Sequence, residues 1–227
     1  MRLAWRAERA PEHNKLLPSM RNRSTALCIA GAFCAALALA AAVLAALGAG
    51  ERGTHVALQA TARLSFVLFW PAYAAAALAA LFGPRFQPLR RRVREFGLAF
   101  AAAHLVHLGL VAWLSYIGHA PPRGTFIFFG IATLCTYLLA LFSVGRLQRV
   151  LGARGWWLLR TIGLNFIAFA FAVDFLRLPA SASAKYLMGY LPFVLLAVAG
   201  PALRVAAFGQ RALTSAAKLR HSGHSSH

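Results

Sequence analysis

Six apolar stretches, each long enough to cross a lipid bilayer, divide this chain of 227 residues. A helix rises about 1.5 Å per residue, so about 20 apolar residues cross a hydrocarbon core roughly 30 Å thick. The chain is 60% hydrophobic and 13% charged, whereas about 25% of the residues in soluble domains are charged. The sequence therefore predicts an all-α integral membrane bundle of about six transmembrane helices.

The ends of the predicted spans are set by charges and by Gly-Pro or Pro-rich connections. We expect spans at about 25–48, 64–82, 97–117, 125–145, 156–176 and 186–208. Together they form one transmembrane domain, residues 24–208, between a basic N-terminal segment, 1–23, and a polar tail, 209–227. Pro71 falls inside the second span, where a membrane helix tolerates it because neighbours can satisfy the freed carbonyl.

The formal net charge of +19 would suggest nucleic-acid binding in a soluble protein, but here the charge sets the orientation of the helices. If the spans alternate in direction, 18 of the 24 Lys and Arg residues fall on one side, five fall on the other, and Arg160 lies inside the fifth span. Cytoplasmic connections carry an excess of Lys and Arg. We therefore predict that both termini are cytoplasmic, that the partner is the lipid bilayer, and that no nucleic acid is bound.

Two histidines, His104 and His107, lie near the middle of the third predicted span. Their spacing of three residues places them on one helix face, and ionisable groups at this depth are costly and commonly functional. A neutral imidazole facing a bundle interior can ligate haem iron, or it can hydrogen-bond to a neighbour or a trapped water. Two ligands on one helix cannot hold both faces of a porphyrin. His55 and His119 are expected in loops on the non-cytoplasmic side.

The fifth predicted span contains three further polar side chains. Arg160 lies a few residues inside the cytoplasmic boundary, where its guanidinium can reach the interface or bind an anion such as a propionate. Asp174 is expected to pair with Arg177 or to relay protons. Asn165, in the middle of the span, is placed where it could hydrogen-bond to the histidine pair.

The residues around the histidine pair resemble the third helix of ferric-reductase-like membrane proteins. In residues 91–105, arginines precede Gly-Leu, an aromatic residue, small residues and His-Leu, which is the pattern that opens that helix. Residues 62–71 resemble the second helix of the family, and residues 149–159 are also similar to it. The resemblance covers roughly residues 58–177. It is closest to the haem-binding membrane subunit of the bacterial periplasmic methionine sulfoxide reductase system.

This resemblance implies a haem b bundle in a bacterial-type inner membrane that passes electrons from a quinol (or quinone pool) or a flavin to a periplasmic reductase partner. His104 matches the third-helix haem ligand of the family, and His107 has no counterpart there. The two fifth-helix histidines of the family are replaced by Arg160 and Val173. Two hypotheses follow. One is a divergent electron-transfer subunit, and the other is a cofactor-free six-span anchor, assembly or carrier protein.

Overall fold

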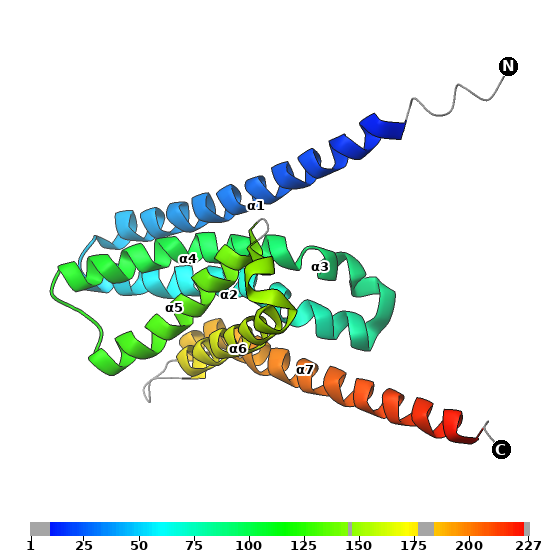
Figure 1. The fold of residues 1–227 in the computed structure, drawn as a ribbon. Coiled ribbons are helices and arrows are strands. Elements are labelled where there is room, and N and C mark those ends of the chain that lie inside the picture. The colour runs from blue at the N-terminus through cyan, green and yellow to red at the C-terminus, as the bar shows by residue number, and fades with distance from the viewer. Residues whose placement is uncertain (1–9, 145–146, 177–183, 225–227) are drawn as a thin grey trace.

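The computed structural model describes residues 10–144, 147–176 and 184–224, and within these ranges every regular element is a helix (Figure 1). In chain order the elements are α1 (Ala10–Leu47), α2 (Glu51–Phe82), η2 (Gly83–Phe86), α3 (Gln87–Arg91), α4 (Val93–Tyr116), α5 (Arg123–Ser143), α6 (Gln148–Leu176) and α7 (Ala184–His224). Six of the described helices, α1, α2, α4, α5, α6 and α7, are long and apolar enough to cross a membrane. The prediction of an all-α protein with six candidate membrane spans is confirmed.

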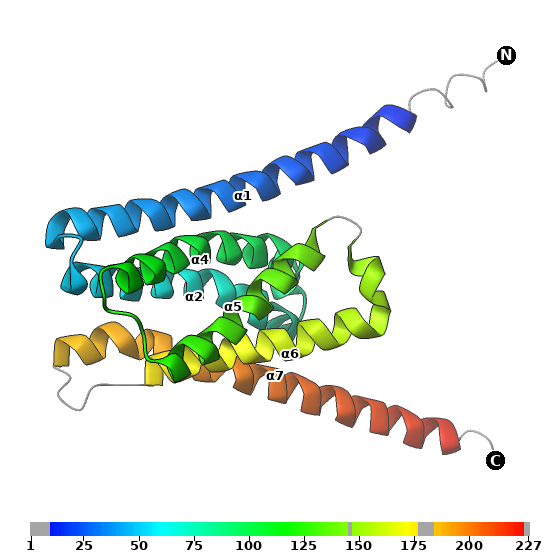
Figure 2. The ribbon, with the colours of Figure 1, turned by 60° about the vertical axis from the view of Figure 1, so that its left-hand side comes forward.

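The six long helices pack as two groups that are joined by α7. In the first group α4 lies against both α1 and α2, and in the second group α5 packs mainly on α6. The last helix, α7, packs on α2 and on α6, and so connects the groups. Figure 2 shows α1 on one side of the α2–α4 pair and α5, α6 and α7 on the other. Contact between α4 and α5 is much less extensive than contact within each group, which leaves room for cavities between the groups.

The beginning of α1 and the end of α7 project from the same end of the bundle (Figures 1 and 2). The same end carries the arginine-rich connection of residues 83–92 between α2 and α4. We call it the basic end. The opposite end carries the connections of residues 48–50 and 117–122. The placement of the basic end in the cytoplasm stays a prediction.

We expect a fluorescent protein fused after His227 to fluoresce in intact bacteria, because the excess of Lys and Arg holds the basic end in the cytoplasm. Alkaline phosphatase fused at the same position is expected to be inactive, since its disulfides form in the periplasm. The matched control is a phosphatase fused after Pro121, in the connection between α4 and α5, which is expected to be active. Active phosphatase at the C-terminus would contradict the predicted orientation.

The second membrane helix, α2, begins at Glu51 and not at Leu64, where the sequence predicted its start. The polar residues before Leu64 end the apolar stretch in the sequence, but they do not end the helix. Glu51, His55 and Gln59 are spaced by four residues, so they share one face of α2, and all three line a cavity. The prediction that His55 lies in a loop is therefore wrong, because a polar face can continue a helix where it borders a cavity.

A cluster of aromatic rings holds α2, α6 and α7 together. Phe66 of α2 is 2% exposed, and its ring centroid lies 5.1 Å from that of Phe171 and 4.9 Å from that of Phe175, both in α6. Phe193 of α7 completes the contact at 6.3 Å. Lipid tails are as apolar as these rings, so the cluster stabilises the bundle through close packing and not through removal of surface from water. It fixes α6 relative to α2.

Two glycines allow membrane helices to cross closely. A Cβ added to Gly163 of α6 would lie 3.1 Å from the Cδ1 atom of Leu139 in α5, and one added to Gly200 of α7 would lie 3.1 Å from the ring of Tyr73 in α2. Small residues at crossing points let helix backbones approach in membranes, where packing drives association. These crossings hold α5 on α6 and α7 on α2.

Candidate functional site

A cavity of about 920 Å³ lies between α2, α4, α5 and α6 and reaches the connection between α4 and α5 at the end opposite the basic end. Its volume is within the range of about 300–1,000 Å³ that is usual for ligand and cofactor sites. Every histidine whose side chain the structure describes lines this cavity, namely His55, His104, His107 and His119. We call it the histidine cavity.

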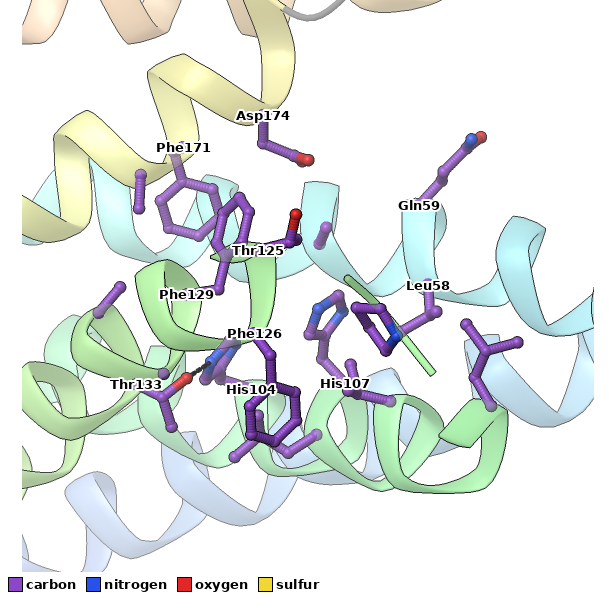
Figure 3. Close-up of a pocket in the computed structure, with 18 of the residues that line it drawn as sticks. Leu58, Gln59, His104, His107, Thr125, Phe126, Phe129, Thr133, Phe171 and Asp174 are labelled. Carbon is purple, nitrogen blue, oxygen red and sulfur yellow. Dashed lines mark hydrogen bonds between the residues drawn. The ribbon is translucent and has the colours of Figure 1, made fainter. Parts of the chain in front are cut away.

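The two histidines of α4 face the cavity side by side (Figure 3). The ring centroids of His104 and His107 are 5.3 Å apart, and the ring planes differ by 14°. Stacked rings on one helix face approach the cavity from the same side, so either histidine is a candidate to hold a haem iron, and the two would not hold one iron together.

His107 is oriented by a hydroxyl group of α2. The Oγ1 atom of Thr61 lies 3.1 Å from Nδ1 of His107 and 2.9 Å from the carbonyl oxygen of Ala57. The hydroxyl hydrogen of Thr61 can go to the carbonyl oxygen of Ala57, to that of Leu58 at 3.1 Å, or to Nδ1 of His107, so the roles in the contact with His107 depend on the tautomer of the imidazole. When Nδ1 carries the hydrogen and donates it to Thr61, Nε2 of the neutral ring carries the free lone pair. Histidines that bind metals usually have one nitrogen held in this way while the other binds the metal.

His104 makes a weaker polar contact, to α5. Its Nε2 atom lies 3.5 Å from Oγ1 of Thr133, a contact drawn as a dashed line in Figure 3. This distance is at the outer limit for a hydrogen bond. The ring centroid lies 5.6 Å from that of Phe100 and 6.3 Å from that of Tyr137. The imidazole is therefore held mainly by aromatic neighbours, and a ligand could replace its contact with Thr133 at little cost.

The wall formed by α5 and α6 is largely aromatic. Phe126 and Phe129 of α5 and Phe171 of α6 border the cavity, and Asp174 of α6 lies beyond them (Figure 3). Apolar and aromatic walls with a few polar groups are typical of cofactor sites. Val173, which stands where the resembled family has a histidine, does not line the cavity. Among the described residues α6 therefore offers the carboxylate of Asp174 and no imidazole.

Two polar residues of α6 lie away from the histidines. The Oδ1 atom of Asn165 accepts a hydrogen bond from the hydroxyl of Tyr73 at 2.9 Å, and its Nδ2 donates to the carbonyl of Thr161 at 2.9 Å. The expected contact between Asn165 and the histidine pair is therefore wrong, because this face of α6 meets Tyr73. Arg160 lines a second cavity, at the basic end. Arg177 lies outside the described residues, so its expected pairing with Asp174 stays a prediction.

Three buried residues, Phe100, Thr136 and Ile167, line both cavities. They come from α4, α5 and α6 respectively, and each is less than 5% exposed. They form a partition between the histidine cavity and the second cavity. In the resembled family the positions of Arg160 and Val173 carry histidines. Here Arg160 lines the second cavity, and Asp174, next to Val173 in the chain, lines the histidine cavity, so the two positions lie on opposite sides of the partition.

The sequence did not point to the hydroxyl groups that contact the histidines. Thr61 is 46 residues from His107, and Thr133 is 29 residues from His104. Thr133 lies in the predicted span 125–145, whereas Thr61 precedes the predicted span 64–82, and pairing either residue with its histidine requires the packing of α2 and α5 around α4.

Comparisons with protein-family models, with curated proteins and with solved structures found no match.

Proposed function

We propose that this chain is a divergent ferric-reductase-like membrane subunit that binds haem b in the histidine cavity. The observation that carries the proposal is a pair of half-buried histidines, His104 and His107, on the wall of a cavity large enough for a cofactor, in the middle of a membrane helix. Of the helices that line the cavity, α2, α4, α5 and α6 largely coincide with the stretch that resembles the family, residues 58–177, and α7 adds Tyr190. When bound, haem b supplies a reversible one-electron carrier.

In this proposal the protein's own residues bind and shield the cofactor. An imidazole of α4 would hold the iron, and the contact with Thr61 would orient the ring of His107. The resemblance favours His104 as the ligand, and the contact with Thr61 favours His107. Aromatic side chains of α5 and α6 keep water from the site. Electrons would enter from a quinol or flavin and leave to a periplasmic reductase in a bacterial-type inner membrane.

The proposal is tested by the visible spectrum of the purified full-length chain. We expect a Soret band in the oxidised protein and sharp α and β bands in the reduced-minus-oxidised spectrum after expression with added haem precursor. A saturable haem titration of apoprotein should give the same bands. A colourless protein that shows no saturable haem binding would contradict the proposal.

The second candidate is a six-span anchor, assembly or carrier protein without a cofactor. The observation that favours it is the composition of α6, which carries Arg160 and Val173 where the resembled family has histidines. In that case His107 and Thr61 form a structural contact between α4 and α2. The haem titration separates the candidates, because the anchor has no saturable haem site.

Removing the hydroxyl of Thr61 is expected to weaken haem binding by about 10- to 100-fold, as is usual when the partner of a metal-binding histidine is lost. The change Thr61→Val keeps the shape of the side chain. The matched control is Thr136→Val, because Thr136 is also a buried threonine whose hydroxyl bonds to a carbonyl of its own helix, that of Ala132, but it contacts no histidine among the described residues. Equal haem affinities of the two variants in a titration would show that Thr61 does not orient a ligand.

A further inference from the structure

A second cavity, of about 550 Å³, lies at the basic end of the bundle. Its lining includes five arginines that come from α3, α4, α6 and α7: Arg90, Arg91, Arg94, Arg160 and Arg211. We call it the arginine cavity. The orientation of membrane helices requires positive charge on the cytoplasmic side, but it does not require arginines from four separate elements to border one cavity.

The spacing of the arginines brings them together. Arg90 lies in the short helix α3, and Arg94 lies four residues later, in the first turn of α4. On α7, Arg211 lines the cavity and shares a helix face with Arg204, seven residues before it. Arg160 enters from α6, and its charge is repelled by those of Arg90 and Arg204. The arrangement therefore holds several positive charges close together, and their mutual repulsion has to be offset by another interaction.

No carboxylate among the described side chains neutralises this group. The acidic residues whose side chains the structure describes are Glu51, Glu95 and Asp174. Glu51 and Asp174 line the histidine cavity, on the other side of the partition, and Glu95 does not line the arginine cavity. Both ion pairs found among the described residues involve Glu51. Within that part of the chain, the five arginines have no carboxylate partner.

A neighbouring arginine shows the same shortage of acceptors. The guanidinium of Arg204 lies 4.5 Å from the ring centroid of Tyr73. Its Nη1 atom is buried and has no hydrogen-bond partner among the described residues. A buried donor without an acceptor is costly. Arg204 does not itself line the cavity, but its charge acts on Arg160, so an anion near Arg160 would offset the repulsion between Arg160, Arg90 and Arg204.

We infer that the arginine cavity binds the phosphate group of an anionic ligand. Guanidinium groups donate paired N–H bonds that match the oxygens of a phosphate, and several arginines can share one phosphate. Trp156, Leu164 and Leu139 add an apolar wall, which suits a ligand with an apolar part. Basic pockets between membrane helices bind lipid head groups, so the phosphate can come from an anionic phospholipid or from a soluble phosphorylated molecule. The inference does not depend on haem.

The test uses the full-length chain, delipidated in neutral detergent. Phosphatidylglycerol is titrated and its binding is measured by native mass spectrometry, with phosphatidylcholine as the lipid control. In parallel, inorganic phosphate is added at fixed ionic strength and the thermal unfolding temperature is measured. We expect one tightly held anion per chain. Saturable binding of phosphatidylglycerol identifies a lipid source, and stabilisation by phosphate beyond that by chloride identifies a soluble source.

Substitutions of single arginines and of one pair test whether the anion binds in the arginine cavity. Arg94→Gln/Arg160→Gln is expected to weaken the binding at least tenfold, because charge-assisted contacts are lost. Arg92→Gln is the matched control, since Arg92 belongs to the same basic connection but does not line the cavity, and it should bind normally. Arg211→Gln, an exposed change on α7, gives a second measurement if the double variant does not fold. Failure of both probes to bind, or equal weakening in Arg92→Gln and the cavity variants, would overturn the inference.

Discussion

Replacing both histidines of α4, in the variant His104→Ala/His107→Ala, is expected to remove bound haem from the purified protein. These are the two imidazoles in the middle of the membrane helix that face the histidine cavity, and alanine provides no atom that can ligate iron. The Soret and α bands should fall to the background of an empty-vector preparation. The measurement is the pyridine haemochrome assay on protein of equal concentration.

The two single variants and one control show which histidine binds the haem. His119→Ala removes an imidazole at the mouth of the same cavity, in the connection between α4 and α5, and is expected to keep its haem. Loss of haem in His107→Ala alone would select the histidine that Thr61 orients, and loss in His104→Ala alone would select the histidine that matches the family. Full haem content in the double variant would exclude both as ligands.

Replacing Phe66 with alanine is expected to destabilise the bundle by about 3 kcal/mol, at the lower end of the range for Phe→Ala changes in buried cores. The ring is 2% exposed and packs against three aromatic rings of α6 and α7. Its loss leaves a cavity at the point where both helices meet α2. The free energy of unfolding is measured by denaturant titration in detergent micelles.

The neighbouring residue provides the control for this change. Val67 lies on the same helix but is 48% exposed and faces outward, so Val67→Ala changes few contacts within the protein. We expect its free energy of unfolding to stay within about 0.5 kcal/mol of that of the unchanged protein. Similar values for Phe66→Ala and Val67→Ala would show that the aromatic cluster does not hold the bundle together.

The helices could be predicted from the sequence because the bilayer dictates their length and their apolar character. The third predicted span, 97–117, agrees closely with the apolar part of α4. The start of α2 was missed because Glu51, His55 and Gln59 interrupt the apolar stretch, and their shared face becomes visible only when the chain is read with helical periodicity. An apolar stretch shows lipid contact, but it does not show contact with an internal cavity.

The candidate site could be predicted in part. The depth and spacing of His104 and His107 follow from their position in one helix, and the structure places both on the cavity wall. Their partners could not be predicted, because Thr61 and Thr133 lie on other helices. Asn165 shows the same limit, since its depth suited a contact with the histidines but the rotation of α6 directs it to Tyr73.

The partition of Phe100, Thr136 and Ile167 has an electrical consequence. The two cavities hollow the bundle from opposite ends and meet at these three side chains. When both cavities hold water, these side chains separate the two water-filled regions, so the apolar layer at the centre of the protein is thinner than the surrounding hydrocarbon, which is roughly 30 Å thick. A membrane voltage then falls mainly across this thin layer. A unit charge that crossed the partition would therefore gain or lose much of the value of about 2.3 kcal/mol per 100 mV over a path shorter than the thickness of the membrane.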